Sequence, residues 1–272
     1  MLRPAEPAQQ LTPFVRRYIH LEVPASQSPL FWSIPARSTT CIEFTFGNPY
    51  RIHHVDGSRV EITHPATLIG AKTHRRIRLE LSGCVETFAI LFEPTGLQRL
   101  FSLPGTEIVN EHYAADMVLG SAMAVLRSKL GEAKSFQERV QMADAFLSAR
   151  IPYVSREHAV EDAVQEIVVK RGCVQISDLA RQMGLGVRQF ERRFRELLGT
   201  SPKFYARIVR FEAAIRRKTA SPLINWTQIA HELEYHDQMH MIRDFRLLSG
   251  ETPSSLAPQF ELLGSMLKPT QR

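Results

Sequence analysis

The chain lacks abundant cysteines and long apolar runs, features that mark disulfide-bonded and membrane proteins. Its 272 residues include three cysteines, Cys41, Cys84 and Cys173, without paired spacing, so we expect reduced thiols and no disulfide framework. No apolar run reaches the roughly 18–20 residues of a membrane span, and no signal peptide opens the chain. These absences predict a cytoplasmic protein without membrane contact. The composition, 44% hydrophobic and 23% charged, is that of a globular protein long enough for two domains.

Metal-binding patterns are also scarce. His53, His54, His64 and His74 lie in a region that predicts strands, where neighbours such as His53 and His54 point to opposite faces. No His-x-His pair occurs in the chain. We therefore expect polar or surface histidines, with no metal and no cofactor.

The sequence also lacks residue patterns that are typical of catalytic sites. His231 and His236 are five residues apart, whereas a zinc pair on one helix face needs a spacing of four. A DNA-repair methyl acceptor would need clustered cysteines, and here they are scattered. Without clustered ionisable residues, we expect no catalytic site and no enzyme.

The positive charge is concentrated in one segment. Residues 1–150 carry 16 basic and 14 acidic side chains, a net of +2. By contrast, Val187 to Lys218 holds ten Lys/Arg against three Glu, a local +7 in a chain whose total is +6. Such a segment favours a polyanionic partner.

Within this segment, residues 186–202 predict a short two-faced helix followed by a turn. Apolar positions recur at helical spacing on one face, and they are Phe190, Phe194, Leu197 and Leu198. The opposite face carries Arg188, Glu191, Arg192 and Arg195. A short apolar helix and a Gly-containing turn precede it, so residues 176–198 predict a helix-turn-helix.

The same pattern returns further along the chain. Phe194-Arg195 recurs as Phe245-Arg246 at an offset of 51, while upstream positions recur at 50. The repeat predicts a second helix-turn-helix at about 226–248, one residue longer in its turn. Between the units, residues 202–219 predict a helix about 27 Å long. That rod suits two recognition helices about one DNA turn, roughly 34 Å, apart.

The exposed faces of the two second helices give candidate DNA contacts. Arg188 and Arg192 are placed to read base edges, with Glu191 between them able to accept from cytosine. Arg195 is a further candidate on the same face, and the candidates for phosphate contacts are Arg193, Lys203, Arg207 and Arg210. In the second unit the candidates are Gln238, Met239, His240, Ile242 and Arg243, with Asp237 capping the helix. A solvated charged face is the alternative interpretation.

These residues give the chain its resemblance to a known family. ISDLARQMG, GVRQFERRF and WTQIAHELEYHDQMHMIRDF, spanning about Val174 to Pro258, resemble the AraC/XylS family of bacterial transcription regulators. One departure is Glu234, where the family's second copy usually has glycine. The resemblance implies binding of double-stranded DNA at two adjacent major-groove segments, and contact with RNA polymerase. Activation and repression both remain open.

The N-terminal half predicts a β-rich domain. Short apolar runs at 41–47, 50–55, 59–63, 66–70, 77–81 and 85–92, and one within 11–23, are separated by turn-forming pairs. Helical periodicity follows at 95–101, 117–130 and 136–147, and again at 155–170. We therefore predict an α+β fold with a β-barrel or cupin-like domain at 1–150 and an all-α DNA-binding domain at 151–272. The first half resembles the regulatory modules of the family.

Two roles for this N-terminal domain stay open. Ile42, Phe44 and Phe46 share one strand face, which either lines an effector pocket with Trp32 or His20, or fills the core. The helices from 117 to 147 are candidates for a homodimer surface. The leading hypothesis is a regulator controlled by a small-molecule effector or by dimerisation. The alternatives are a scaffold that binds no ligand and an enzymatic cupin fused to a DNA-binding domain.

Overall fold

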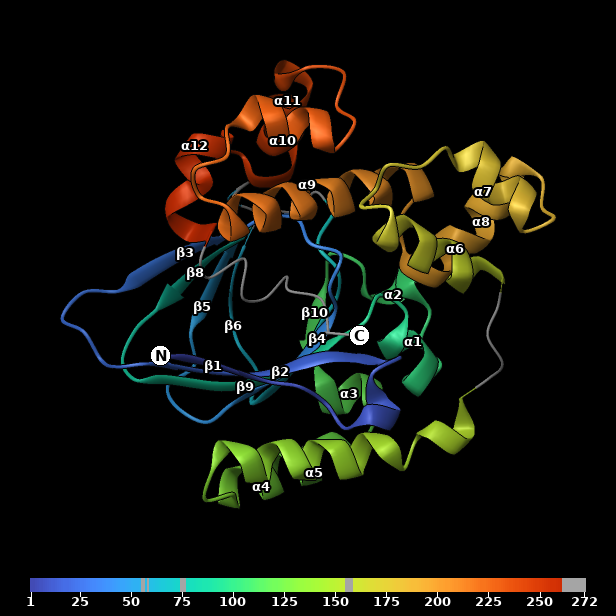
Figure 1. The fold of residues 1–272 in the computed structure, drawn as a ribbon. Helices are drawn as coiled ribbons and strands as arrows, with labels where there is room; N and C mark the ends of the chain where they lie inside the picture. Colours follow the sequence, from blue (N-terminus) through green and yellow to red (C-terminus); the bar gives the residue numbers. More distant parts are fainter. Residues whose placement is uncertain (55–56, 58, 74–76, 155–158, 261–272) are drawn as a thin grey trace.

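The protein is arranged in three layers, with β-sheets in the middle and helices on two sides (Figure 1). A computed structural model describes residues 1–54, 57, 59–73, 77–154 and 159–260. His74, the beginning of the helix expected at 155–170, and residues 261–272 lie outside the described residues. Among the described helices, none is both long and apolar enough to cross a membrane.

Within the described residues, ten strands build two antiparallel sheets. The six-stranded sheet has the order β1-β2-β9-β4-β7-β10, and the four-stranded sheet has the order β3-β8-β5-β6. The strands are β1 (Leu2–Ala5), β2 (Val15–Val23), β3 (Leu30–Ile34), β4 (Cys41–Thr45), β5 (Arg51–His54), β6 (Val60–Ile62), β7 (Ala66–Ile69), β8 (Ile77–Leu81), β9 (Val85–Phe92) and β10 (His112–Ala114). The two sheets face each other in a cupin-like, β-barrel-like arrangement.

Side chains along β4 alternate between the two faces of the six-stranded sheet. Ile42 and Phe44 are buried in the core between the six-stranded sheet and the helices below it. Cys41 and Glu43 point the other way, toward the four-stranded sheet. Since successive side chains on a strand alternate, one face builds the helix-covered core and the other lines the space between the sheets.

Helices cover the outer face of the six-stranded sheet, where α4 and α5 lie as a pair (Figure 1). The helices of this half are η1 (Gln9–Leu11), α1 (Gly96–Phe101), α2 (Gly105–Ile108), α3 (Ala115–Leu119), α4 (Ala122–Glu132), α5 (Phe136–Ser148) and η2 (Ile151–Tyr153). The buried residues that α4 and α5 turn toward the sheet are Met123, Leu126, Leu130, Val140, Ala143 and Leu147. Each buried side chain of this size contributes about 1.5–3 kcal/mol by leaving water.

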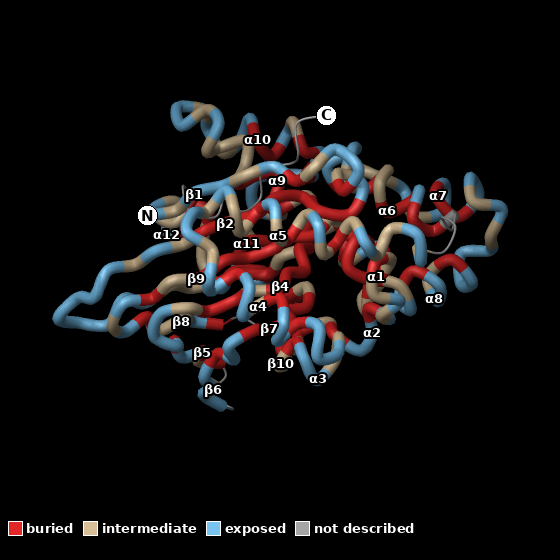
Figure 2. The backbone as a smooth tube through the Cα atoms, turned by 90° about the horizontal axis from the view of Figure 1, so that it is seen from below, coloured by how far each residue is buried: buried red, intermediate tan, exposed pale blue. Residues whose placement is uncertain are grey.

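The C-terminal half is helical. Its elements are α6 (Ala159–Val169), α7 (Ile176–Gln182), α8 (Val187–Leu198), α9 (Pro202–Ala220), α10 (Trp226–Glu232), α11 (Gln238–Ser249), α12 (Pro253–Leu256) and η3 (Ala257–Gln259). The long helix α9 lies between the sheets and two helical groups, α6–α8 at one end and α10–α12 at the other (Figure 1). Figure 2 shows the buried backbone running through the sheets and along α9.

The contacts between the two halves include two at which backbones meet. Residues 35–40, between β3 and β4, reach α9 and α11: the Ala36 N–H donates to the Leu248 carbonyl at 2.7 Å. At the second place, α2 packs against α8 so closely that a Cβ on Gly105 would lie 2.2 Å from the Leu197 carbonyl oxygen. Only glycine permits that approach of one backbone to another.

The predicted elements agree with the structure except at specific points. β1, β3 and β10 were not predicted, because each is short and carries no strong alternation. The helix expected over 117–130 is wrong as one piece. It is broken into α3 and α4 at Gly120, whose φ of +86° ends α3.

The departure at Glu234 has a direct structural counterpart. Glu234 has a φ of +54° in the turn of the second unit, where Gly184 has +65° in the first. An L-residue in this region is strained by about 1–2 kcal/mol, whereas glycine is not.

Replacing Glu234 should therefore stabilise the protein. We expect Glu234→Gly to raise the free energy of unfolding by about 0.5–1 kcal/mol, after the extra unfolded-state entropy of glycine is subtracted. Urea denaturation measures the change. Gly184→Ala is the matched control and should destabilise, since a Cβ there meets nothing within 4 Å and only the backbone conformation is strained. Equal stabilities for Glu234→Gly and the parent chain would contradict the assignment.

Candidate nucleic-acid interface and effector cavity

The first recognition helix, α8, has a fully apolar back. Phe190 and Phe194 are 0% exposed, and their ring centroids are 5.8 Å apart. Phe194 also meets Tyr205 of α9 edge to face, at 5.6 Å. This packing fixes the rotation of α8 about its axis, because an apolar face of this size must stay buried.

The opposite face of α8 is basic and open to solvent. Arg188, Arg192 and Arg195 are exposed, and with Glu191 they line a shallow surface depression together with Thr106 of the N-terminal half, residues 1–150, which is named the regulatory half for its expected role. Arg192 and Glu196 approach to 4.0 Å, but both side chains are about two-thirds exposed, so the pair holds Arg192 only weakly. This face is therefore available to an external polyanion.

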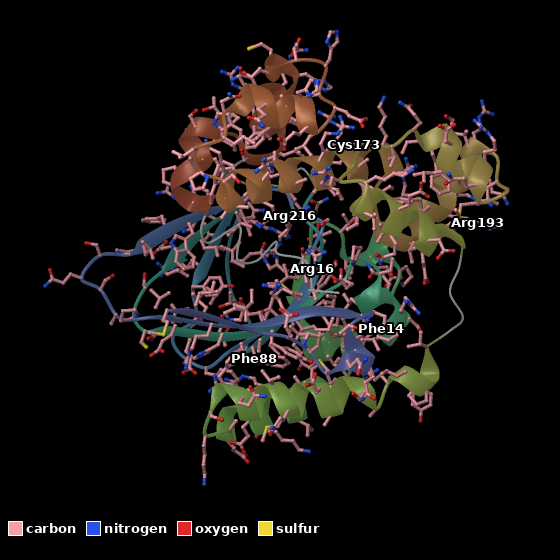
Figure 3. The ribbon with its side chains drawn as sticks, in the orientation of Figure 1. Phe14, Arg16, Phe88, Cys173, Arg193 and Arg216 are labelled. Atoms are coloured by element: carbon pink, nitrogen blue, oxygen red, sulfur yellow. The ribbon has the colours of Figure 1, made fainter. Side chains whose placement is uncertain are left out.

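Arg193 points in another direction from its neighbours. It lines a groove between α8 and the regulatory half, with Gln98, Arg99 and Leu103 on the far wall. Figure 3 labels it near the outer end of the α6–α8 group. Its position next to α1 separates it from the basic face formed by Arg188, Arg192 and Arg195.

The second recognition helix, α11, is built on the same plan. Met241, Phe245 and Leu248 are 0% exposed, and Phe211 of α9 packs on Phe245 with centroids 4.7 Å apart. Asp237 caps the helix by accepting from the His240 N–H at 2.6 Å. That backbone hydrogen bond lowers the pKa of Asp237 and keeps it ionised.

The outer face of α11 is less basic and more apolar than that of α8. Gln238, Met239 and Arg243 are exposed, Met239 by 54%. Ile242 and His240 are half-buried, and the His240 ring meets Tyr235 edge to face at 5.4 Å. In a major groove these apolar groups can pack against thymine methyl groups, whereas in the free protein they are exposed to water.

One rod carries both recognition helices. Helix α9 has 19 residues, a length of about 28 Å. Phe211 and Ile215 join the core around α11, while Tyr205 and Val209 join the core around α8. The two units are thus fixed to opposite ends of one element.

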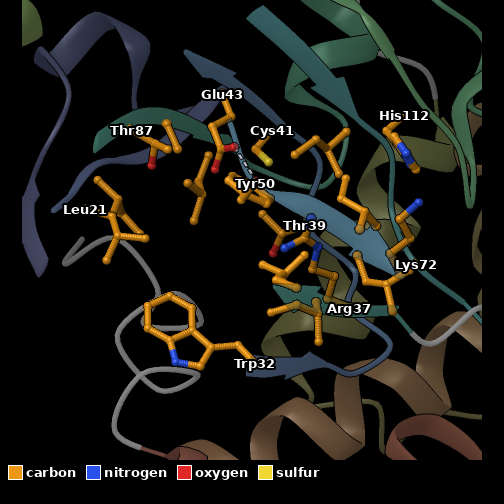
Figure 4. Close-up of a pocket in the computed structure, with 18 of the residues that line it drawn as sticks. Leu21, Trp32, Arg37, Thr39, Cys41, Glu43, Tyr50, Lys72, Thr87 and His112 are labelled. Atoms are coloured by element: carbon orange, nitrogen blue, oxygen red, sulfur yellow. Dashed lines mark hydrogen bonds between the residues drawn. The ribbon is translucent and has the colours of Figure 1, made fainter. Parts of the chain in front are cut away.

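A second feature, in the regulatory half, is a cavity between the two sheets (Figure 4). Its volume is about 90 Å³, and because one water needs about 10–15 Å³ on this scale, a slender molecule fits. Most of its wall is apolar, formed by Ile19, Leu21, Trp32, Ile34, Ile52, Ile69, Ile77, Leu79, Leu81, Ala89 and Leu91.

Two cations lie on one side of this cavity. Arg37 and Lys72 are joined by paired backbone hydrogen bonds of 2.7 and 3.0 Å. The Lys72 ammonium is fully buried and donates to the Asn110 carbonyl at 2.7 Å. The Arg37 Nε is buried and has no hydrogen-bond partner among the described residues. The cavity therefore offers positive charge beside an apolar slot.

A buried acid lies on the wall as well. The Tyr50 hydroxyl donates to Glu43 at 2.5 Å, the bond drawn in Figure 4. Burial raises the pKa of Glu43, although the Tyr50 hydrogen bond and the charge of Arg37 act in the opposite direction. With Glu43 engaged by Tyr50, Arg37 remains the side chain able to meet an entering anion.

Three of the four predicted effector contacts lie elsewhere. Phe44 is in the helix-covered core, and Phe46 packs against that core under the Arg139 guanidinium. His20 interacts with Glu86 and stacks on Phe136 of α5. Of the two roles left open for this face, the structure shows the core and not the pocket lining, because the helices cover it. Trp32 does line the cavity, and sequence reasoning missed Arg37 and Lys72, which no local pattern marks.

Comparison with known proteins agrees with this architecture. Residues 179–258 match the model of a helix-turn-helix domain, and residues 3–114 match a domain of unknown function (DUF6597). The C-terminal half therefore carries a helix-turn-helix domain of the AraC type. No curated protein matches the sequence at a significant level.

Solved structures with this AraC-type architecture include ToxT from Vibrio cholerae. A structure at 1.65 Å resolution has a TM-score of 0.53 and 10% identity, covering 89% of this chain and 98% of ToxT. ToxT from strain O395 has a TM-score of 0.51 and 12% identity, covering 92% and 98%. A third ToxT structure, bound to (E)-4-(8-methylnaphthalen-1-yl)but-3-enoic acid, has a TM-score of 0.53 and 10% identity, covering 93% and 100%. At this identity the likeness shows the two-domain fold.

Within this AraC-type domain, two basic residues of α9 are used internally. The Arg207 guanidinium donates to Asp244 of α11 at 2.6 and 3.1 Å, and Asp244 is 1% exposed. Arg210 donates to the Gly172 carbonyl at 2.9 Å and lies over Tyr235. Partners within the protein thus hold both guanidinium groups, and a role of either residue as a phosphate contact stays a prediction. Lys203 is exposed near the start of α9 and stays a candidate.

The base-reading assignment of α8 leads to a direct test. We expect Arg192→Ala to lose about 1–3 kcal/mol of discrimination at one or two base positions, because a bidentate contact to guanine would be removed. Binding to a library of randomised sites measures base preference. Arg193→Ala is the matched control, one residue along and turned toward α1, and should leave base preference unchanged. Equal losses on specific and random DNA for Arg192→Ala would make it a phosphate contact.

Proposed function

We propose that this protein is a cytoplasmic, non-catalytic regulator that reads two adjacent major-groove segments of double-stranded DNA and is controlled by a small-molecule effector. The observation that carries the DNA half is the pair of recognition helices, each with an apolar back and an open polar face, on the rod α9. A rod of about 28 Å places the two faces near one helical turn of DNA apart. The match to a helix-turn-helix domain supports this proposal, and contact with RNA polymerase is proposed from the resemblance to the AraC/XylS family.

The effector is a slender apolar molecule with one carboxylate. The aliphatic walls would bury its chain, and Arg37 would meet its carboxylate through the unpartnered Nε. Lys72 adds positive charge on the same side. The likeness to ToxT supports the same class, because one of those structures is bound to an arylbutenoic acid.

The loop at residues 35–40 connects the cavity to the DNA-binding domain. Its side chains alternate: Arg37 and Thr39 line the cavity, while Ala36 and Ser38 face the helices. The Ser38 N–H donates to Glu212 of α9 at 2.7 Å, and its hydroxyl lies 2.9 and 3.0 Å from the two oxygens of that carboxylate. A carboxylate pulling on Arg37 thus shifts a segment that is bonded on its other side to the rod.

Dimerisation is a second level of control. The outer surface of the α4–α5 pair carries an apolar groove that includes Val125, Met142 and Phe146. Val125 is 56% exposed at this groove. The matching surface is the same groove on a second copy, because a two-fold axis brings one patch against itself.

The effector proposal is tested with carboxylates on the full chain. We expect decanoate at about 100-fold excess over its Kd to stabilise the protein by about 2.7 kcal/mol, while decanol, which lacks the charge, stabilises it less. Arg37→Gln should weaken decanoate binding about 10–100-fold, the loss of one charge-assisted hydrogen bond. Thermal melts and calorimetry measure both. Equal effects of decanoate and decanol would contradict the role of Arg37, and no binding across the carboxylates would leave this half as a scaffold.

The coupling loop has its own variant. Ser38→Ala should keep decanoate binding but reduce the effect of decanoate on DNA affinity, because the hydroxyl contacts with Glu212 are lost and only the backbone N–H bond remains. DNA titrations with and without decanoate measure the effect. Ser33→Ala on β3 is the control and should behave as the parent chain. A Ser38→Ala protein that still responds fully would place the coupling elsewhere.

The dimer surface is tested by sedimentation equilibrium. Val125→Glu should shift the protein toward monomer, since a charge in an apolar groove is left unpaired on association. Gln141→Glu on exposed α5 surface adds the same charge and should leave the association unchanged. A parent chain that is monomeric at all accessible concentrations would rule out this interface.

A further inference from the structure

Three potential metal ligands meet where the open edges of the two sheets come together. His54 is on β5, Glu61 is on β6 and His112 is on β10. The His54 Nε2 is 2.9 Å from one oxygen of Glu61, and the His112 Nε2 is 2.5 Å from the other. One ligand atom from each residue lies within 4.8 Å of the other two.

The two imidazoles are buried and fixed. The side chains of His54 and His112 are each 2% exposed, and their rings stack at 5.9 Å with 20° between planes. β6 and β10 are the edge strands of their sheets, so no backbone ladder joins them. The cluster is thus a side-chain link across the seam between the sheets.

Hydrogen bonds alone do not satisfy this cluster. The His54 Nε2 lies 2.9 Å from a Glu61 oxygen, which needs a proton, and 3.2 Å from the Arg59 Nε, which supplies one. A single ring nitrogen cannot be donor and acceptor at once. In addition, both ring nitrogens of His112 are buried without a hydrogen-bond partner among the described residues, although Nε2 lies 2.5 Å from a Glu61 oxygen. We propose that His54, Glu61 and His112 form a binding site for a divalent transition-metal ion of the Zn²⁺ type.

A metal ion resolves the conflict at His54. Both Nε2 atoms would present lone pairs to the ion, and the Glu61 carboxylate would supply the third ligand. Two imidazoles and one carboxylate suit Zn²⁺ or Co²⁺, whereas Ca²⁺ and Mg²⁺ prefer oxygen ligands. His112 also lines the cavity, so a fourth coordination position could open toward it.

Arg59 is the cation that such an ion would displace. Its guanidinium contacts Glu61 and also lies 3.1 Å from Glu111, whose side chain is partly exposed. The Arg59 guanidinium can keep its ion pair with Glu111 when its contact with Glu61 is broken, because the Arg59 side chain is 43% exposed and has room to move. Lys72 is the other nearby cation, and the Asn110 and Glu111 carbonyls bind its ammonium. Arg59 therefore competes with the metal, and its removal should strengthen binding.

Cobalt titration of the full chain, after treatment with a chelator, tests the proposal. We expect one Co²⁺ per chain, with the intense visible bands of a four- or five-coordinate site, and displacement by Zn²⁺. His54→Ala and His112→Ala should each weaken binding by more than the roughly 10–100-fold that a change next to a ligand costs. Arg59→Gln should bind Co²⁺ more tightly than the parent chain.

Controls separate this site from other ligands and from loss of fold. His53→Ala changes the neighbouring histidine, which faces Glu80 at 2.6 Å on the other side of β5, and should bind as the parent chain does. Glu61→Gln keeps the size of the side chain and should weaken binding, with circular dichroism verifying the fold. Absence of binding to both the parent chain and Arg59→Gln would overturn the proposal. Undiminished Co²⁺ binding to His54→Ala and His112→Ala would also overturn the proposal. Thiolate-to-cobalt charge-transfer bands would overturn it too, because they would place the ion at a cysteine.

Discussion

A buried carboxylate joins the two halves of this protein. Glu212 lies on α9 with 2% of its surface exposed, and burying such a charge is costly unless hydrogen bonds and opposite charge offset it. Ser38 of the regulatory half supplies both its N–H and its hydroxyl, and the Arg216 guanidinium lies 3.8 Å away. Figure 3 shows Arg216 and Arg16 in the junction below α9. Because α9 is also the core of both helix-turn-helix units, this contact is made at the element that positions every DNA-facing side chain.

The helical half was largely predictable from the sequence because its signals are local. Phe190 and Phe194, four residues apart on an apolar stripe, need no distant partner to define the buried face of α8. The repeat of this stripe at Phe245 gave the second unit, and the extra turn residue is present between α10 and α11. Most strands were found for the same reason, since alternation is a property of the strand itself.

What could not be predicted depends on contacts between distant segments. Alternation placed Phe44 and Cys41 on opposite faces of β4, but only the docking of α4 and α5 decides which face is filled. Arg207 carried the same charge as a phosphate contact would, and its partner Asp244 is 37 residues away. His112 was not considered beside His54, because β5 and β10 meet only through the fold. In each case the residue type was visible and its neighbour was not.

The regulatory half contacts the two recognition helices in different ways. Against α8 it places the backbone of Gly105, at a distance that leaves no room for a side chain. Against the end of α11 it places a peptide hydrogen bond from Ala36, within the same loop that borders the cavity. If a ligand moves this loop, as proposed, it would act directly on α11 and on α9, whereas the contact of Gly105 with α8 lies outside the loop. The occupancy of promoters that depend on a good second half-site would then change most as the ligand concentration varies. Promoters with a strong first half-site would change less, so that one ligand would alter the relative occupancy of different promoters.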